Sequence, residues 1–335
     1  MDKVSNILCG KDLTEDAAAA IKECRFVVTD SNLASLYPEL TSGAFVIPAG
    51  ENSKRQSVLF NILSAMQKKG IKRSDRVCSV GGGVVSDITG LAAAMYMRGV
   101  EWVNIPTSLL AMVDAGIGGK TAINFNGVKN LVGAFHLPER IVISAIFLKT
   151  LPDREWLDGA GELIKTCLLT EDAYKALNAN LDGLKAKDID KVYPLISLCV
   201  DIKNAVVKAD PKEGGLRKIL NVGHTVGHAL ESIEKYKLSH GEYVLKGMMT
   251  ELTMCKDIVD NSFYREILPI LRSFTNPPTA AASAVCRRSL SDKKNDANTI
   301  SVMVPTSPGK VTEVKMRQDD YKSRYASALK ELNAL

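Results

Sequence analysis

The chain has 335 residues, of which 46% are hydrophobic and 24% are charged. This balance is typical of a folded globular protein. It excludes a disordered or collagen-like chain, because there is enough apolar surface to offset the entropy lost on folding. Forty-three basic against 38 acidic residues give a net charge of +5 that is not gathered in runs. We therefore expect a small anionic substrate rather than a nucleic acid, and the length predicts two domains.

The distribution of apolar and cysteine residues excludes further classes. No run of about 18 apolar residues is present, since Asp87, Arg98 and Asp114 interrupt the longest candidates, so we expect no membrane contact. Too few apolar residues precede Lys11 for a signal peptide. The seven cysteines are scattered without a CxxC pair, which is typical of reduced thiols in a cytoplasmic protein and argues against zinc held by cysteine.

Short β-rich runs alternate with a helical pattern in the first half of the chain. The expected strands are 25–29, 44–47, 77–80, 102–105 and 141–147. Between the second and third, residues 53–69 place apolar side chains at helical spacing and are followed by Gly70, a typical helix end. This alternation predicts a Rossmann-like, mostly parallel sheet with helices on both faces, in which ligands bind beyond the carboxyl ends of the strands.

The second half changes character after Pro152. Helical patterns alone follow as far as about residue 288, at 153–169, 172–182, 191–209, 216–234, 241–260 and 263–273. Two possible strands, 299–304 and 310–314, and a last helix complete the chain. The sequence therefore predicts an α/β domain over 1–152 and an all-helical domain over 153–335.

A run of three glycines, Gly81 to Gly83, follows an expected strand and opens a helix. Glycines at such a point let the backbone approach a phosphate, which the unpaired N–H groups of the helix would bind. The dinucleotide fingerprint GxGxxG fails, because Ser86 stands in place of its last glycine. A phosphate cradle and a simple tight turn remain equally good interpretations, and Asp87 could serve only to complement the helix dipole.

A second glycine-rich stretch, Gly118-Gly119-Lys120-Thr121, imitates the end of a nucleotide-triphosphate loop. The first glycine of that motif would fall at Asp114, so we exclude a triphosphatase. Lys120 and the following Lys129 are candidate anion-binding residues of this loop, although two lysines in a loop are more often solvated.

Three of the four histidines, His224, His228 and His240, are close together in the sequence. In a continuous helix over 216–234, His224 and His228 share one face with Arg217 and Asn221, a polar stripe that predicts either a site or an exposed face. Imidazoles four residues apart suit a divalent metal, and the spacing favours His224 with His228 as ligands. A third ligand could be His240 or a carboxylate such as Glu162.

Two lysines stand in apolar surroundings. Lys165 follows Glu162 by three residues in an apolar helix, so the two share a face and form either part of a site or an internal ion pair. Lys203 interrupts an apolar stripe, which indicates either a buried functional cation or a lysine whose stem covers apolar surface while its head stays in water.

Five segments together resemble the 3-dehydroquinate synthase family. They are GGGVVSDITGLAAAMYMRG, residues 106–130, GAGELIK, KNAVVKADPKEGGLRKILNVGHTVGHALE and SHGEYVLKGM. The resemblance extends from about residue 29 to 248 and weakens afterwards to the run Asp292-Lys293-Lys294. It implies conversion of 3-deoxy-D-arabino-heptulosonate 7-phosphate to 3-dehydroquinate and phosphate, the second step of the shikimate pathway, by a cytoplasmic homodimer.

The resemblance also implies cofactors and site residues. Glu162, His224 and His240 look like the ligands of a catalytic Zn²⁺ or Co²⁺, and His228 would lie beside the metal. NAD⁺ would be held by Asp30, Asn32, Glu51, Lys54, Gly82, Gly83, Asp87, Thr107, Ser108, Asp114, Lys120, Lys129, Phe147 and Thr150. The substrate would be held by Asp114, Lys120, Lys129, Asn130, Lys165, Lys203, Arg217, Asn221 and His228, and Arg98 would reach the phosphate site of a neighbouring subunit.

The chain departs from the usual pattern of the family without losing a charged group. Ser108 replaces threonine, Gly161 replaces alanine, and Val222 and Val226 replace aromatic residues. The alternatives are another sugar-phosphate cyclase, making 2-deoxy-scyllo-inosose or a valiolone, a metal-dependent alcohol dehydrogenase, or a non-enzymatic protein that only binds metal or NAD. The dehydrogenase would release NADH and need no cluster of phosphate-binding lysines.

Overall fold

A computed structural model describes residues 5–211, 213–290 and 298–334. The chain divides into two compact units. The first unit comprises the chain up to Pro152 together with Asp182–Lys208, and the second comprises Asp153–Leu181 and the chain from Ala209 onward. The sequence predicted one division near residue 152. The returning segment belongs to the first unit because its side chains bind there, as the hydrogen bond from Tyr193 to the Cys9 carbonyl illustrates (3.4 Å).

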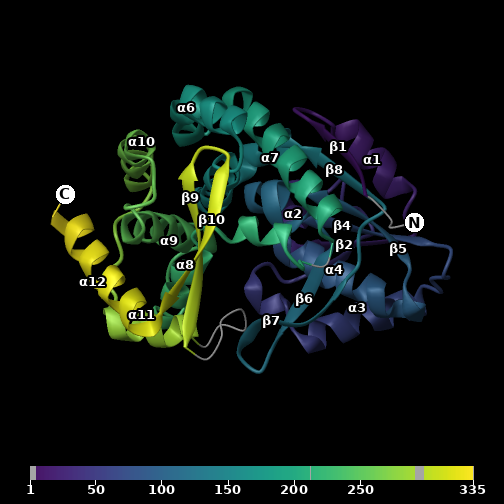
Figure 1. The fold of residues 1–335 in the computed structure, drawn as a ribbon. Coiled ribbons are helices and arrows are strands. Elements are labelled where there is room, and N and C mark those ends of the chain that lie inside the picture. Colours follow the sequence, from purple (N-terminus) through teal and green to yellow (C-terminus); the bar gives the residue numbers. More distant parts are fainter. Residues whose placement is uncertain (1–4, 212, 291–297, 335) are drawn as a thin grey trace. The chain divides into compact units, whose positions relative to one another are not determined.

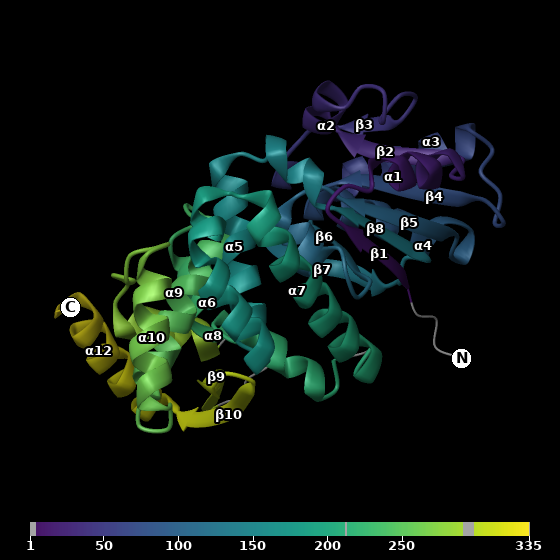
Figure 2. The ribbon, with the colours of Figure 1, turned by 90° about the horizontal axis from the view of Figure 1, so that it is seen from above.

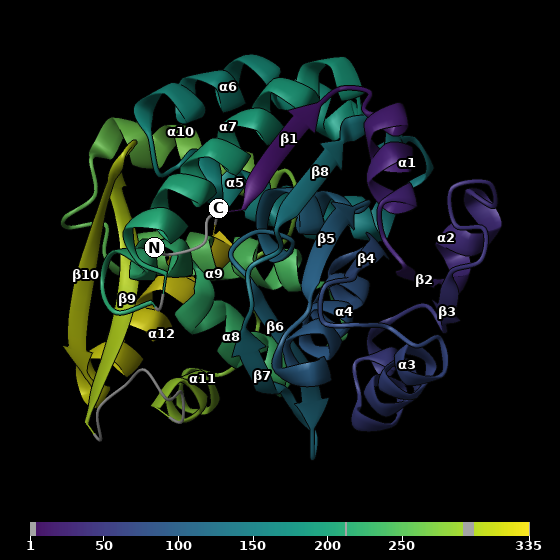
Figure 3. The ribbon, with the colours of Figure 1, turned by 90° about the vertical axis from the view of Figure 1, so that its right-hand side faces the viewer.

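The first unit is built on a six-stranded, fully parallel sheet, as expected from the alternating pattern. Its strands are β1 (Asn6–Gly10), β2 (Phe26–Asp30), β3 (Phe45–Ile47), β4 (Arg76–Gly81), β5 (Glu101–Pro106) and β8 (Arg140–Ser144). They lie in the order β1-β8-β5-β4-β2-β3 (Figure 3). The sequence missed β1, and it extended the last strand too far, because residues after Ser144 turn into the 3-10 helix η4 (Ala145–Thr150).

The helix expected over residues 53–69 is present as α3 and buries apolar side chains at the predicted spacing. The helices of this unit are α1 (Thr14–Lys22), α2 (Ser31–Leu36), α3 (Gln56–Lys68), α4 (Gly83–Met95) and α7 (Ile189–Ala209), with short turns η1 (Glu51–Ser53), η2 (Tyr96–Arg98) and η3 (Ala111–Ala115). Ile62 of α3 and Ile88 of α4 lie in one core with Val77 and Trp102 of the sheet. After α3, Gly70 adopts a left-handed φ of +67°, which glycine allows at little cost.

The glycine-rich stretch after η3 is a β-hairpin rather than the predicted loop. It consists of β6 (Lys120–Phe125) and β7 (Val128–Phe135), which pair antiparallel. Asn126 and Gly127 both have positive φ, as a two-residue hairpin turn requires. Lys120 and Lys129 therefore project from strands, whose geometry fixes them more closely than a loop would.

The second unit is mostly helical and also contains a β-hairpin (Figures 1 and 2). Its elements are α5 (Asp153–Cys167), most of α6 (Glu171–Ala186), η5 (Leu216–Asn221), α8 (His224–Ile233), α9 (His240–Met254), α10 (Asn261–Arg272), α11 (Ala282–Leu290), β9 (Thr299–Ser307), β10 (Lys310–Arg317) and α12 (Gln318–Ala334). The two possible strands expected at 299–304 and 310–314 are confirmed as β9 and β10, yellow in Figure 1, which pair antiparallel, so the unit is not helical throughout. The sequence analysis also missed α11.

The predicted continuous helix over 216–234 is interrupted. It consists of η5, an extended residue Val222, Gly223 with φ of +75°, and then α8. A Cβ on Gly223 would lie 2.5 Å from Cγ of Met248, so a side chain does not fit here. The prediction that Arg217 and Asn221 share one helix face with the histidines was therefore wrong.

Among the described residues, no helix has both the length and the apolar character that a membrane crossing requires. All seven cysteines are free thiols.

Candidate functional site

The second unit gathers three histidines at the start of two neighbouring helices. His224 is the first residue of α8, His228 lies one turn later, and His240 is the first residue of α9. Their ring centroids are 5.0, 5.4 and 5.6 Å apart, and each ring offers one nitrogen within 4.8 Å of the other two. This grouping could bind a divalent cation through any of the three.

Glu162 of α5 reaches the same cluster from another part of the sequence. Its Oε1 lies 3.5 Å from Nε2 of His224 and 3.3 Å from Nε2 of His240. Ligands of a tetrahedral zinc at about 2.0–2.1 Å are separated by about 3.3 Å, so Oε1 of Glu162 lies at a ligand-to-ligand distance from both imidazole nitrogens. Both carboxylate oxygens are buried, and Oε2 faces the ammonium group of Lys165, whereas Oε1 faces the imidazoles. A cation at this point would satisfy Oε1.

Glycines explain how three helices come close enough to build this cluster. A Cβ on Gly161 would lie 2.3 Å from the Gly241 carbonyl, and one on Gly241 only 1.9 Å from the Asp158 carbonyl, so α5 and α9 touch backbone to backbone. A Cβ on Gly247 would lie 1.9 Å from the Gly223 carbonyl, which places α8 equally close to α9. The departure from alanine at Gly161 thus matches a contact that leaves no room for a methyl group.

Burial and neighbouring charges shift the pKa values of the two imidazoles in opposite directions and keep the Glu162 carboxyl ionised. Burial and the positive charge of Lys165 lower the pKa of His224 well below its usual value. Burial acts in the same direction on His240, but Glu162 and Glu231 outweigh it and raise its pKa to about 10. Burial would raise the pKa of Glu162, yet Lys165 and His240 outweigh it and keep the carboxyl ionised.

Further groups hold the rings in place. Nδ1 of His224 lies 3.0 Å from the Val222 carbonyl, and Nδ1 of His240 lies 3.4 Å from Oε2 of Glu231. Such partners orient imidazole ligands toward a metal. The sequence analysis missed Glu231, although its place three residues after His228 puts both on one helix face.

Asp158 was missed as well. It precedes Glu162 by one turn of α5, and its Oδ1 accepts a 2.6 Å hydrogen bond from the Gly241 amide at the start of α9. Burial raises the pKa of Asp158 to about 6, against the opposing effect of this hydrogen bond. The helical spacing of two acidic residues is the signal that could have found it.

Lys165 makes the internal ion pair that the sequence offered as one of two interpretations. Its Nζ lies 2.5 Å from Oε2 of Glu162, and the side chains of both residues are at most 1% exposed. Because the same carboxylate also faces the imidazoles, the ion pair is part of the cluster, and the two interpretations do not exclude each other.

Two other predicted residues of the second unit, Arg217 and Asn221, lie in η5. Arg217 is 2% exposed, and its Nη1 donates to the Pro211 carbonyl at 3.1 Å. Asn221 closes η5 and is half-buried. The carboxylate of Asp210 holds this segment through the amides of Gly214, Gly215 and Arg217, at 2.7–3.0 Å. Lys293 and Lys294 lie outside the described residues.

In the first unit, predicted cofactor residues line the carboxyl ends of β4 and β5. β4 ends at Gly81, Gly82 caps α4, and the Thr107 amide donates to the Gly81 carbonyl at 3.0 Å. A Cβ on Gly82 would lie 3.3 Å from Oγ of Ser108, so the glycine keeps this edge open. Gly83 begins α4, as the sequence predicted, and this is the edge where parallel sheets bind ligands.

A polar network joins four of the predicted residues. Nζ of Lys54, which is 5% exposed, contacts both Asp87 and Asn130, and burial raises the pKa of Asp87 to about 6 against the effect of this lysine. Asn124 donates to Glu51 at 2.7 Å and accepts from the Asn130 amide at 2.9 Å. The sequence analysis missed Asn124, whose position in β6 only the hairpin reveals.

Lys203 is a buried cation and does not extend into water. It is 5% exposed, and its Nζ binds both the carbonyl and the carboxylate of Asp114 at 2.5 Å. Asp114 lies in η3, a single wide turn closed by a hydrogen bond from Gly116 back to Ala111 (2.8 Å). Wide turns of this type are frequent at functional sites.

The remaining predicted residues are more exposed. Asp30 uses its carboxylate to cap α2 through the amides of Asn32 and Leu33, at 2.8 and 3.0 Å. Thr150 is exposed, and its Oγ1 lies 2.9 Å from the hydroxyl of Tyr37, a residue that the sequence analysis missed.

The ring of Tyr37 packs edge-on against buried Phe147, with centroids 5.3 Å apart.

Lys120 begins β6 and is exposed, whereas Lys129 in β7 is half-buried. Arg98 is exposed at the end of η2, between the exposed Met97 and Gly99.

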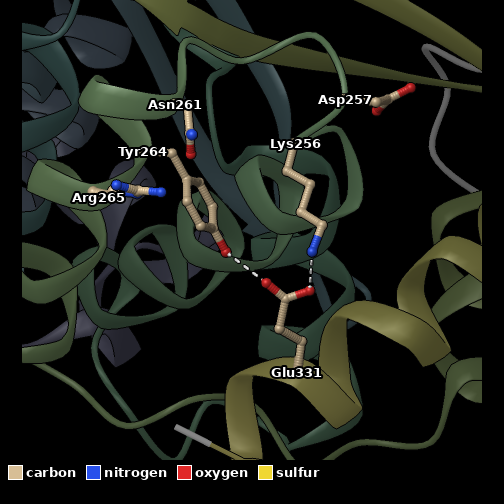
Figure 4. A pocket seen from close by; sticks show the side chains of 6 residues that line it. All are labelled: Lys256, Asp257, Asn261, Tyr264, Arg265 and Glu331. Atoms are coloured by element: carbon tan, nitrogen blue, oxygen red, sulfur yellow. Dashed lines mark hydrogen bonds and ion pairs between the residues drawn. The ribbon is translucent and has the colours of Figure 1, made fainter.

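A separate pocket of about 470 Å³ lies on the second unit (Figure 4). It is lined by Lys256, Asp257, Asn261, Tyr264, Arg265 and Glu331. Glu331 binds Lys256 at 2.5 Å and accepts a hydrogen bond from Tyr264 at 3.4 Å (Figure 4). None of the predicted site residues lines it, so it has no part in the candidate site.

Comparison with known proteins shows to which family the chain belongs. Residues 44–158 match the model of the 3-dehydroquinate synthase N-terminal domain, and residues 159–295 match that of the C-terminal domain. This chain belongs to the 3-dehydroquinate synthase family. A 3-dehydroquinate synthase from Alkaliphilus metalliredigens is 37% identical over 88% of this chain and 87% of its own length. Another from a Shewanella species is 34% identical over 91% and 90%.

Solved structures agree with this family. A 2-epi-5-epi-valiolone synthase from Streptomyces hygroscopicus, solved with NAD⁺ and Zn²⁺, has a TM-score of 0.87 and 26% identity, covering 99% of this chain and 98% of its own. A 2-deoxy-scyllo-inosose synthase, solved with carbaglucose-6-phosphate, NAD⁺ and Co²⁺, shares the fold with a TM-score of 0.82, 22% identity and 96% coverage of both chains. The predicted fold class is thereby confirmed.

Proposed function

We propose that this member of the 3-dehydroquinate synthase family catalyses the reaction for which its curated relatives are named. It converts 3-deoxy-D-arabino-heptulosonate 7-phosphate to 3-dehydroquinate and phosphate, a step of aromatic amino acid biosynthesis. The observation that carries the proposal is that Oε1 of Glu162 lies 3.5 Å from Nε2 of His224 and 3.3 Å from Nε2 of His240, in a chain that matches the family from residue 44 to 295.

Glu162, His224 and His240 are the proposed ligands of Zn²⁺ or Co²⁺. Three protein ligands leave a position open for the substrate, as catalytic metal sites require. The choice of Glu162 over His228 comes from the family resemblance and is supported by the buried Oε1, which lies at a ligand-to-ligand distance from both imidazoles. Lys165 fixes the other oxygen of the same carboxylate, which prevents it from turning away.

The first unit is the proposed NAD⁺-binding part. Gly82 and Gly83 allow the cofactor's phosphates to approach the start of α4, where unpaired amides favour negative charge. The other proposed cofactor residues are Asp30, Asn32, Glu51, Lys54, Asp87, Thr107, Ser108, Asp114, Lys120, Lys129, Phe147 and Thr150. When bound, NAD⁺ accepts a hydride and returns it, and a divalent metal lowers the pKa of a hydroxyl that it binds.

The residues of the chain neutralise and orient a doubly anionic substrate. A phosphate and a carboxylate need several cations, and buried ones bind them more strongly than exposed ones. The proposed substrate residues are Asp114, Lys120, Lys129, Asn130, Lys165, Lys203, Arg217, Asn221 and His228. Asp114 holds the Lys203 ammonium in place, and the Pro211 carbonyl accepts from the Arg217 guanidinium, so both cations have a partner in the protein before substrate arrives.

A homodimer and a cytoplasmic location are part of the proposal. Met95 and Met97 are 47% and 50% exposed next to Arg98, and an apolar surface of this kind supports contact with a second subunit. Seven free thiols support a reducing compartment.

The decisive assay follows two products at once. Purified protein is incubated with the heptulosonate phosphate, catalytic NAD⁺ and Zn²⁺, and phosphate release is measured together with 3-dehydroquinate. We expect equal amounts of both products and no accumulation of NADH, because the hydride returns to the substrate. Steady growth of NADH absorbance would instead indicate a dehydrogenase. Absence of turnover would indicate a non-enzymatic protein that only binds metal or NAD.

The similarity to the valiolone and inosose synthases favours a second candidate, another sugar-phosphate cyclase. Glucose 6-phosphate is therefore the comparison substrate, since the carbaglucose-6-phosphate bound in one of them is its analogue with carbon in place of the ring oxygen. We expect no phosphate release from it, since the proposed cluster of cations suits a substrate that also carries a carboxylate.

A further inference from the structure

Glu251 is a buried carboxylate that the catalytic proposal does not use. It lies on α9 and is 1% exposed. Its Oε2 accepts the amide of Gly223 and its Oε1 accepts the amide of Val226, each at 2.9 Å. The first amides of a helix have no partner inside the helix, so Glu251 satisfies the start of α8 with both oxygens.

The start of α8 is also where His224 stands. Its ring is held by the Val222 carbonyl at 3.0 Å, so the orientation of the imidazole depends on the backbone immediately before the helix. That backbone turns through Gly223 in the left-handed region. An interaction that fixes the Gly223 and Val226 amides therefore fixes the direction in which Nε2 of His224 points.

The same carboxylate connects the two helices that carry the histidines. α9 begins with His240 and contains Glu251, and α8 begins with His224. A further contact of α8, from Oγ1 of Thr225 to the Ser301 carbonyl (2.9 Å), leads to β9 and not to α9. Glu251 is thus a direct polar link that sets the start of α8 against the helix of His240.

We propose that Glu251 is a positioning residue for the metal centre, which orients His224 relative to His240 by holding the first turn of α8. This rests on the proposed function, because that function assigns both histidines to the metal. In its ionised form Glu251 is suited to the task, since each carboxylate oxygen accepts from a different amide. A glutamine offers one acceptor oxygen and places an amide donor against the other backbone N–H.

The test compares Glu251→Gln with Thr250→Val in the full chain. Thr250 is the neighbouring residue of α9, equally buried, and its hydroxyl donates within its own helix, to the Lys246 carbonyl at 2.7 Å. Each metal-free protein is titrated with Co²⁺ while its visible absorption is recorded, and Zn²⁺ affinity is measured against a chromophoric chelator.

We expect Glu251→Gln to weaken metal binding at least tenfold and to change the Co²⁺ spectrum, as loss of a group behind a metal ligand does. Thr250→Val should keep the wild-type spectrum and affinity. Wild-type spectrum and affinity in folded Glu251→Gln would overturn the inference and leave Glu251 a purely structural cap. If Glu251→Gln does not fold, Glu251→Asp, which keeps both oxygens on a shorter side chain, is judged by the same two criteria.

Failure of the proposed function looks different. If the wild-type protein itself binds no Co²⁺, or binds it unchanged after His224→Ala, the metal site is wrong. If the wild type binds through His224 and Glu251→Gln binds identically, only the role of Glu251 is wrong.

Discussion

The two units build their candidate sites from different structural elements. In the second unit, the acidic and imidazole side chains come from three helices that touch backbone to backbone at glycines, and Glu162 and Lys165 are almost fully buried. In the first unit, the residues come from strand ends, a wide turn and a hairpin, and several, such as Glu51 and Lys120, are exposed. The helical arrangement of the second unit suits a cation that needs ligands at fixed distances. The arrangement of the first unit suits a larger ligand that binds along the edge of a sheet.

This contrast also has an energetic side. A buried carboxylate without ordinary hydrogen bonds is costly unless a cation satisfies it. In the second unit Lys165 offsets part of that cost, and a bound metal would offset more. In the first unit, the Lys54 and Lys203 ammonium groups already have carboxylate partners. We therefore expect substitutions in the second unit to affect metal binding and stability together, and those in the first to affect ligand binding more selectively.

The largest effect is expected from His224→Ala. It removes one proposed ligand from a site in which three protein groups converge, so metal binding and turnover should be lost together. Metal content and phosphate release are the two measurements, and replacement of His136, whose ring bonds to the Val100 carbonyl in the first unit, is the control. A fully active, metal-replete variant would refute the ligand assignment.

Lys203→Met should have the next largest effect. It removes a buried cation beside Asp114, so we expect kcat/KM for the sugar phosphate to fall by about a hundredfold, the size of other losses of a preorganised charged group. The dissociation constant of NAD⁺, measured by calorimetry, should stay nearly unchanged. An equal loss of both would place Lys203 in the cofactor site.

Gly161→Ala tests the close crossing of α5 and α9. The new methyl carbon would lie 2.3 Å from the Gly241 carbonyl, and overpacking of this kind costs about 1–3 kcal/mol of unfolding free energy. Because the helices must separate, Zn²⁺ affinity should fall as well. Gly214→Ala, whose nearest neighbour would be at 3.7 Å, is the matched control for urea unfolding and metal titration. Unchanged values for Gly161→Ala would mean that the crossing tolerates the alanine usual in the family.

The pH dependence of stability should distinguish the buried acid Glu251 from the exposed acids. Burial raises its pKa from 4.5 to about 8, against the effect of its backbone hydrogen bonds. Between these values the folded protein keeps a proton that the unfolded chain releases, so this contribution to stability is present below pH 4.5 and lost as the pH rises through 8. In urea unfolding of the metal-free wild type, the free energy of unfolding should fall as the pH rises from 4.5 to 8. In Glu251→Gln the fall over this range should be smaller, because the titrating carboxyl is absent. Parallel curves would contradict the raised pKa.

Arg98→Ala should have the smallest effect. An exposed arginine at the end of η2 influences catalysis only if it reaches the site of a second subunit. We expect a modest rise in KM for the sugar phosphate with unchanged thermal stability, and sedimentation measures whether a dimer is present. Unchanged kinetics in a dimeric protein would argue against a shared site.

Local signals in the sequence determined much of the fold. Strand and helix periods, and glycines at helix ends, reflect short-range sterics and hydrogen bonding, so the parallel sheet, α3 and the turn into α4 could be predicted. The pairing of Glu162 with Lys165 followed from helical spacing in the same way. The resemblance to a family supplied the link from Glu162 to His224 and His240, which spacing alone would have replaced by His228.

Only the tertiary structure decided how these pieces meet. The break at Gly223 depends on Met248 of another helix, and the place of Glu162 beside His240 depends on glycines that let α5 and α9 touch. The caps that Asp158 and Glu251 provide join residues far apart in the chain. No local pattern records such contacts, because their energy comes from packing and buried hydrogen bonds that exist only once the helices are side by side.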